Sequence, residues 1–98
     1  MAHTLIIKEE AANDIKEAYL YYEEQKAGLG VRFLNTLEIH LERVKQYPEH
    51  YQIKRPPYRE AFVKDFPYLI VYELEATTVI VYAVFNTWKN PAKKTSKK

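Results

Sequence analysis

The chain has 98 residues and a formal net charge of +2, a length that allows one domain with a small core. It contains no cysteine, which excludes disulfide bonds and cysteine-ligated zinc and gives no sign of an oxidising compartment. The longest apolar run, residues 79–85, is far shorter than the roughly 20 residues of a membrane span, and the N-terminus does not resemble a signal peptide, so we expect a cytoplasmic protein.

The first half of the chain predicts a short strand followed by two helices. The strand is residues 5–7, and two glutamates after it supply the acidic first turn that a helix favours. Gly28 and Gly30 can take left-handed conformations, so we expect them to end the first helix and start the second, which Pro48 stops. The helices then form an antiparallel hairpin. Their apolar stripes are Ala11, Ile15, Ala18 and Tyr22, and Phe33, Leu34, Leu37, Leu41 and Val44.

The second half predicts a sheet of β-branched and aromatic strands. Residues 49–58 are rich in proline and polar side chains and are expected to form a loop. Short connections between the later strands favour an antiparallel meander. The expected fold class is therefore α+β, with an N-terminal strand, a helical hairpin and a three-stranded antiparallel meander. The strands of the meander are residues 60–64, 68–74 and 79–85.

The last predicted strand is apolar on both faces, although the chain has only two helices to cover the sheet. Its second face is either hidden by aromatic side chains such as Tyr82 and Trp88 or covered by a partner chain. We expect a partner segment to cover it, and binding of that partner then stabilises the fold.

Charge is distributed unevenly along the chain. Residues 1–50 carry six Lys and Arg against nine Asp and Glu, whereas residues 51–98 carry nine against four. An anionic partner is therefore expected at the second half. We expect one domain over residues 1–91, followed by a lysine-rich, disordered tail over residues 92–98.

The basic residues of the second half form the cluster that could bind an anion. If Arg59 and the ends of the adjacent strands face the same way, their charges converge on one phosphate. The guanidinium of Arg59 suits a phosphate by donating two parallel hydrogen bonds, whereas Lys89 is a less directional point charge. The alternative is that these residues are solvated charges of edge strands, which deter edge-to-edge pairing. The cluster consists of Lys54, Arg55, Arg59, Lys64 and Lys89.

Aromatic and histidine side chains give weaker signals. Tyr51 and Tyr58 lie in the basic loop, where they could stack on a base. His3, His40 and His50 have no metal-ligand spacing, so we expect no metal and no cofactor, and His40 is expected on the surface because it lies off the apolar stripe.

Several short motifs follow one another along residues 4–91. They are Asp14-Ile15, Tyr21-Tyr22-Glu23, Leu29-Gly30 with Phe33 and Leu37, Phe66-Pro67-Tyr68 with Ile70 and Tyr72, and Ala83-Val84-Phe85 leading into Asn90-Pro91. Together they resemble the RelE/ParE superfamily, the toxins of bacterial type II toxin-antitoxin systems, also known as plasmid stabilisation proteins. The resemblance implies a cognate antitoxin that lays its C-terminal segment over the toxin.

Two mechanisms occur in that superfamily, so the resemblance leaves open whether the chain is an enzyme. Members similar to RelE are ribosome-dependent mRNA endoribonucleases, whereas members similar to ParE bind DNA gyrase and poison it. In the nuclease branch, cleavage needs a proton acceptor, a phosphate stabiliser and a proton donor. The resemblance assigns phosphate stabilisation to Arg59.

The motif after the last strand departs from the pattern of many relatives. They carry His-Thr-x-Arg-x-Pro there, whereas this chain carries residues Asn86 to Pro91, in which asparagine replaces the histidine and Lys89 replaces the arginine. Asparagine does not exchange a proton near neutral pH, so the departure favours a ParE-like inhibitor. The alternatives are a RelE-like nuclease that relies on lysines and a tyrosine, and a degenerate relative without toxicity. The candidate site is Arg59 and Lys89 as catalytic residues, with Lys54, Arg55, Tyr58, Lys64, Asn86 and Trp88 as binding residues.

Overall fold

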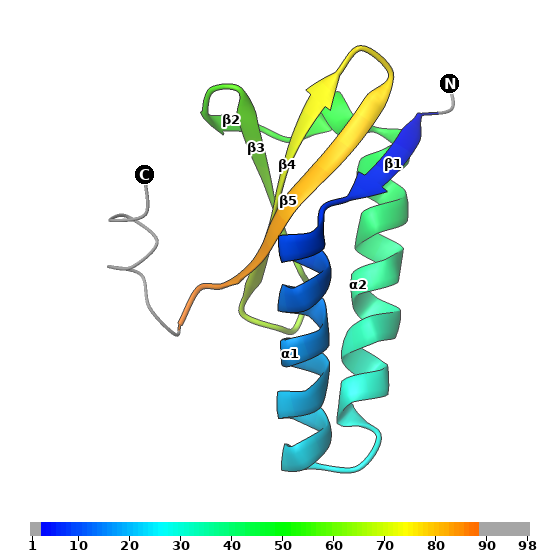
Figure 1. Cartoon of the computed structure of the whole chain (residues 1–98), viewed down its shortest axis with the longest axis vertical. Coiled ribbons are helices and arrows are strands. Elements are labelled where there is room, and N and C mark those ends of the chain that lie inside the picture. Colours follow the sequence, from blue (N-terminus) through cyan, green and yellow to red (C-terminus); the bar gives the residue numbers. More distant parts are fainter. Residues whose placement is uncertain (1–2, 89–98) are drawn as a thin grey trace.

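The computed structural model describes residues 3–88 and shows a helical hairpin packed on one face of a five-stranded sheet (Figure 1). Lys89 and the tail over residues 92–98 lie outside the described residues. In chain order the elements are β1 (Thr4–Ile7), α1 (Glu9–Gln25), α2 (Leu29–Gln46), the short 3-10 helix η1 (Pro48–His50), β2 (Ile53–Arg55), β3 (Tyr58–Phe62), β4 (Tyr68–Glu75) and β5 (Thr78–Asn86).

The strands are arranged in the order β1-β5-β4-β3-β2. β3, β4 and β5 form the expected antiparallel meander, and β1 pairs with β5 in parallel. The helical hairpin carries the chain from β1 at one edge of the sheet to β2 at the other, and the meander then returns to β1. The expected α+β fold is confirmed, with one addition. β2, a three-residue strand inside the expected loop, pairs with β3 and was not predicted.

The helical hairpin is fixed by Glu23 and two glycines. The carboxylate of Glu23 accepts hydrogen bonds from the backbone N–H groups of Gly28 and Gly30, both at 2.8 Å, and so caps the first turn of α2. Gly28 has the expected left-handed conformation, with a φ of 91°. Gly30 has another role, because it lies inside α2 where the helices meet. A Cβ at Gly30 would lie 2.6 Å from the carbonyl oxygen of Tyr19.

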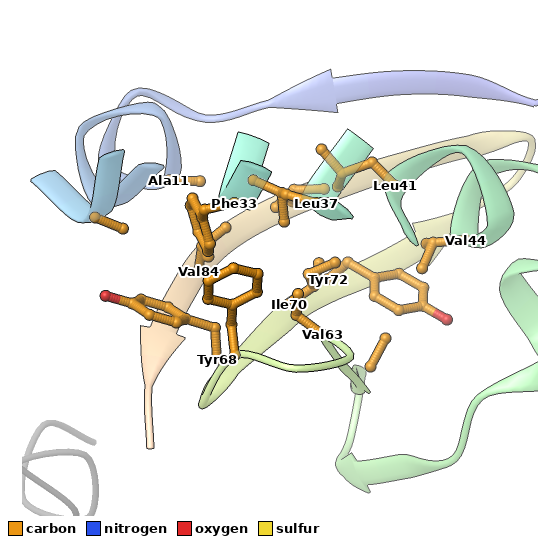
Figure 2. Packing of buried hydrophobic residues seen from close by; sticks show 14 of the residues in the cluster. Ala11, Phe33, Leu37, Leu41, Val44, Val63, Tyr68, Ile70, Tyr72 and Val84 are labelled. Carbon is orange, nitrogen blue, oxygen red and sulfur yellow. The ribbon is translucent and has the colours of Figure 1, made fainter. Parts of the chain in front are cut away.

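The core lies between the hairpin and the covered face of the sheet. Figure 2 shows Tyr68 and Tyr72 at the two ends of the cluster, with Ile70 between them. The ring of Tyr68 packs 5.2 Å from that of Phe33 on α2. Tyr72 is fully buried, and its hydroxyl donates to the carbonyl oxygen of Pro48 at 2.6 Å. Both apolar stripes predicted from the sequence contribute to this cluster.

A bulge in β5 decides which of its residues face the helices. The pairing between β4 and β5 shifts by one residue at Tyr82. Val81 before the bulge and Val84 after it are therefore both buried in the core. The backbone N–H of Val84 donates to the Asp14 carboxylate of α1 at 3.1 Å, which joins the first helix to the bulged strand.

His40 corrects one prediction from the sequence, because it is buried rather than exposed. Its Nδ1 lies 2.9 Å from the carbonyl oxygen of Thr36, and its Nε2 accepts from the backbone N–H of Lys64 at 3.2 Å. A neutral imidazole with its proton on Nδ1 satisfies both contacts. The sequence prediction placed His40 off the apolar stripe, whereas His40 follows Leu37 by three residues and shares its buried face of α2.

Candidate functional site

The described members of the predicted site fall into two groups at opposite ends of the sheet. On β4, Arg59 is opposite Tyr72 and Asn86 is opposite Tyr68. The two positions are therefore about 13 Å apart along the strands and about 10 Å apart across them, at roughly 3.3 Å per residue and 4.8 Å per strand. Arg59 and Asn86 are therefore too far apart to meet at one phosphate, and Lys89, the other expected phosphate ligand, lies outside the described residues. The β2–β3 end carries Lys54, Arg55, Tyr58 and Arg59, and the far end carries Lys64, Asn86 and Trp88.

Arg59 faces the side of the sheet that the hairpin covers. Its Nη1 donates to the carbonyl oxygen of Tyr51 at 2.6 Å, which ties the segment after η1 to β3. Burial raises the pKa of the neighbouring Tyr72, and the positive charge of Arg59 partly opposes this shift. The geometry gives Arg59 a structural role, since its guanidinium holds a backbone carbonyl near the core.

The other residues of the β2–β3 end differ in their surroundings. Arg55 places its Nη2 3.8 Å from Glu60 Oε2. The ring of Tyr58 stands edge-on to that of Tyr82, with 5.4 Å between the centroids, and 38% of its surface stays exposed. Lys54 is exposed on β2. This end of the sheet is therefore mixed in charge rather than purely basic.

The far end is a turn held by hydrogen bonds. Asn86 donates from Nδ2 to the hydroxyl of Tyr68 at 3.2 Å and accepts at Oδ1 from the backbone N–H of Trp88 at 2.9 Å. Trp88 is 81% exposed. Lys64 has an exposed side chain, and its backbone contacts His40. Asn86 thus shapes the chain where it leaves the sheet and presents Trp88 to solvent.

The face of the sheet opposite the hairpin, here called the open face, carries residues that the sequence argument did not assign to the site. The hydroxyl of Tyr82 donates to Glu73 Oε1 at 3.0 Å, and this hydrogen bond raises the pKa of Tyr82. Phe62 on the same face is 70% exposed. Strand alternation could have grouped these residues, but the bulge at Tyr82 could not be foreseen. The open face includes Ile6, Tyr58, Glu60, Phe62, Leu69, Val71, Glu73, Glu75, Ile80, Tyr82, Ala83 and Phe85.

Within residues 3–88, no group of three or more His, Asp or Glu side chains could hold a metal ion. The helices of the same segment include none that is long and apolar enough to cross a membrane.

Comparison with known families decides what the chain is. The sequence model of the family described as ParE toxin of type II toxin-antitoxin system, parDE, matches residues 5–91. The chain belongs to this ParE toxin family. It is therefore the toxin component of a type II toxin-antitoxin module, and membership implies an antitoxin partner.

Solved structures place this ParE-family toxin in the expected fold. The chromosomal ParDE toxin-antitoxin system from P. aeruginosa aligns with a TM-score of 0.78 and 11% identity, over 87% of this chain and 96% of that one. E. coli toxin RelE, in the free state of a double arginine-to-alanine mutant, aligns with a TM-score of 0.70 and 20% identity, over 98% of this chain and 93% of that one. A search of curated proteins found no significant match.

Proposed function

We propose that this ParE-family toxin acts by binding a cellular protein target such as DNA gyrase, without cleaving RNA, and that its antitoxin covers the open face of the sheet. The observation that carries the first part is the separation of Arg59 from Asn86 across the sheet. A nuclease must bring a phosphate stabiliser and a proton-transfer group to the same scissile bond.

The surroundings of the two residues support the same view. One guanidinium N–H of Arg59 donates a hydrogen bond to the carbonyl oxygen of Tyr51. Asn86, where many relatives carry histidine, uses its amide to hold Tyr68 and the backbone of Trp88. A side-chain amide neither gains nor loses a proton near neutral pH, so this position supplies no general acid or base.

The open face supports the part of the proposal that concerns the antitoxin. The helical hairpin covers only one side of the sheet (Figure 1). On the other side, Phe62 is 70% exposed, Ile6 is 45% exposed and Tyr58 is 38% exposed. Large apolar side chains that gather on one exposed face are typical of a binding surface.

Two assays on the full chain separate the mechanisms. Purified gyrase should lose supercoiling activity as the chain is added, while a translating extract should show intact mRNA. Site-specific cuts in ribosome-bound mRNA would overturn the proposal in favour of a RelE-like nuclease. If neither activity is found, the chain is a degenerate relative without toxicity.

Variants then identify the residues responsible. In a nuclease, Arg59→Ala should lower the cleavage rate by about 10²–10³-fold, as does the loss of a donor to a developing oxyanion. His50→Ala is a comparison variant for Arg59→Ala. The ring of His50 lies 5.4 Å from that of Tyr51, whose carbonyl oxygen accepts from Arg59. Thermal unfolding of each variant is the control, since Arg59 also contacts the backbone of Tyr51.

A further inference from the structure

All charged residues that β3, β4 and β5 place on the open face have the same sign. They are the glutamates Glu60, Glu73 and Glu75, although residues 51–98 carry an excess of basic residues. Arg59 lies on the covered side, whereas Arg55 on the edge strand β2 reaches Glu60 at 3.8 Å and offsets its charge, which leaves Glu73 and Glu75 as the source of the negative charge. The open face therefore favours a cationic occupant and disfavours a phosphate backbone.

Two aromatic rings and a carboxylate converge at one place on this face. The bulge projects Tyr82 across β4, where its hydroxyl donates to Glu73 Oε1 at 3.0 Å. The ring of Tyr58, on β3, stands edge-on to the ring of Tyr82 at 5.4 Å. An ammonium or guanidinium group gains both from the π-faces of such rings and from the carboxylate beside them.

Apolar side chains lie on the same face on two sides of this cluster. On β3, Phe62 is 70% exposed, and on β1, Ile6 is 45% exposed. The register places Phe62, Leu69 and Phe85 side by side on the open face, toward the end where β5 finishes. A segment that crosses the face diagonally, from Ile6 on β1 to Phe62 on β3, would thus meet apolar side chains at both ends and the cluster of Tyr58, Glu73 and Tyr82 between them.

We infer that the antitoxin segment that covers the open face presents an arginine or lysine to Tyr58, Glu73 and Tyr82, with apolar residues on either side of that cation. The inference rests on the proposed antitoxin site and adds the chemistry of its occupant. Complementary charge supplies register and specificity here, while the apolar contacts supply the larger part of the buried area.

Isothermal titration of the full-length chain with the purified antitoxin, the product of the adjacent gene, tests this inference. Glu73→Gln should weaken binding about tenfold or more and reduce the dependence of the affinity on salt, because it removes the charge but keeps the shape. Glu75→Gln is the matched control, since Glu75 lies two residues further along the same strand and face, whereas the hydroxyl of Tyr82 donates to Glu73. It should change the affinity less than about threefold.

Tyr58→Leu gives a second route to the same answer if Glu73→Gln disturbs the fold. It removes one ring at a partly exposed position and should also weaken binding. Each Arg and Lys in the antitoxin segment is then replaced by alanine in turn. One of these substitutions should weaken binding to the wild-type toxin but have little effect on binding to the Glu73→Gln toxin, because the two residues act as a pair.

The outcomes separate the inference from the proposed function. If the antitoxin binds the wild type, Glu73→Gln and Tyr58→Leu with the same affinity and the same salt dependence, the inference is overturned and the gyrase assay is unaffected. If the antitoxin does not bind the wild type, the proposed antitoxin site and this inference are both refuted. A polyuridylate probe that binds the chain and binds Glu73→Gln more tightly would assign the open face to RNA and also refute the inference.

Discussion

Replacing Gly30 by alanine should destabilise the toxin, although alanine is the better helix former. Gly30 lies in the first turn of α2, against the backbone of α1 at Tyr19. A Cβ there would lie 2.6 Å from the backbone oxygen of Tyr19 and 2.7 Å from Glu23 Oε1. Contacts under 3 Å force a shift, and the oxygen of Tyr19 belongs to a helix backbone that cannot yield locally. We therefore expect the hairpin to open at this end.

The size of the effect follows from three contributions. Overpacking in a close contact costs about 1–3 kcal/mol. Weakening the Glu23 cap on the N–H groups of Gly28 and Gly30 costs about 1 kcal/mol more. Against these, alanine gains about 1 kcal/mol over glycine in helix propensity. The net loss is about 2 kcal/mol, which lowers the melting temperature of a domain of this size by about 10 °C.

Urea and thermal unfolding followed by circular dichroism measure this change. Asn35→Ala, at an exposed position of the same helix, controls for propensity and should be neutral or slightly stabilising. The double variant with Glu23→Ala should lose less than the sum of the two single losses, because both substitutions disturb the same cap. A Gly30→Ala protein as stable as the wild type would refute the argument from close approach.

Three further predictions concern contacts between distant parts of the chain. Asp14→Ala should cost about 1–3 kcal/mol in urea unfolding, because it leaves the N–H of Val84 in the bulge without this acceptor, whereas a loss under 0.5 kcal/mol would contradict the role of Asp14. Tyr72→Phe should cost about 1–3 kcal/mol by the same measurement, because the carbonyl of Pro48 loses its donor; an unchanged urea midpoint would refute this. Burial raises the pKa of Tyr22 from 10.0 to about 12, so its contribution to stability is complete below pH 10 and is lost as the pH rises toward 12. The free energy of unfolding should therefore fall more between pH 9 and pH 11 for the wild type than for Tyr22→Phe, and equal falls would count against it.

Much of the fold could be predicted because it depends on local patterns. The stripes of α1 and α2 repeat at the spacing of a helix, and the later strands combine β-branched and aromatic residues with short connections. Such a pattern indicates which face of a helix or strand is buried, whichever other elements pack against it. These patterns therefore sufficed for the hairpin and for the meander. β2 escaped prediction because it has three exposed residues and forms only through its pairing with β3.

The positions of the candidate site residues in the sheet could not be predicted, for a physical reason. Residue types indicated a basic cluster, but whether its members meet depends on register and on the face of the sheet that each one occupies. Arg59 faces the core and Glu60 the open side, because successive residues of a strand point to opposite faces. Asn86 lies at the far end of β5, so the pairing through β4 separates it from Arg59. The predicted role of Lys89 lies outside the described residues.

The sequence alone thus determined the class of fold, the helical hairpin and the resemblance to the toxin family. These depend on the periodicity of apolar residues and on short motifs, which are local features of the sequence. Only the tertiary structure decided the functional surface. A single extra residue at Tyr82 changes which side chains of β5 face the helices, and that change is held by a hydrogen bond between Asp14 and Val84, 70 positions apart. Contacts at such separation have no local signature, since they exist only when the whole sheet has paired.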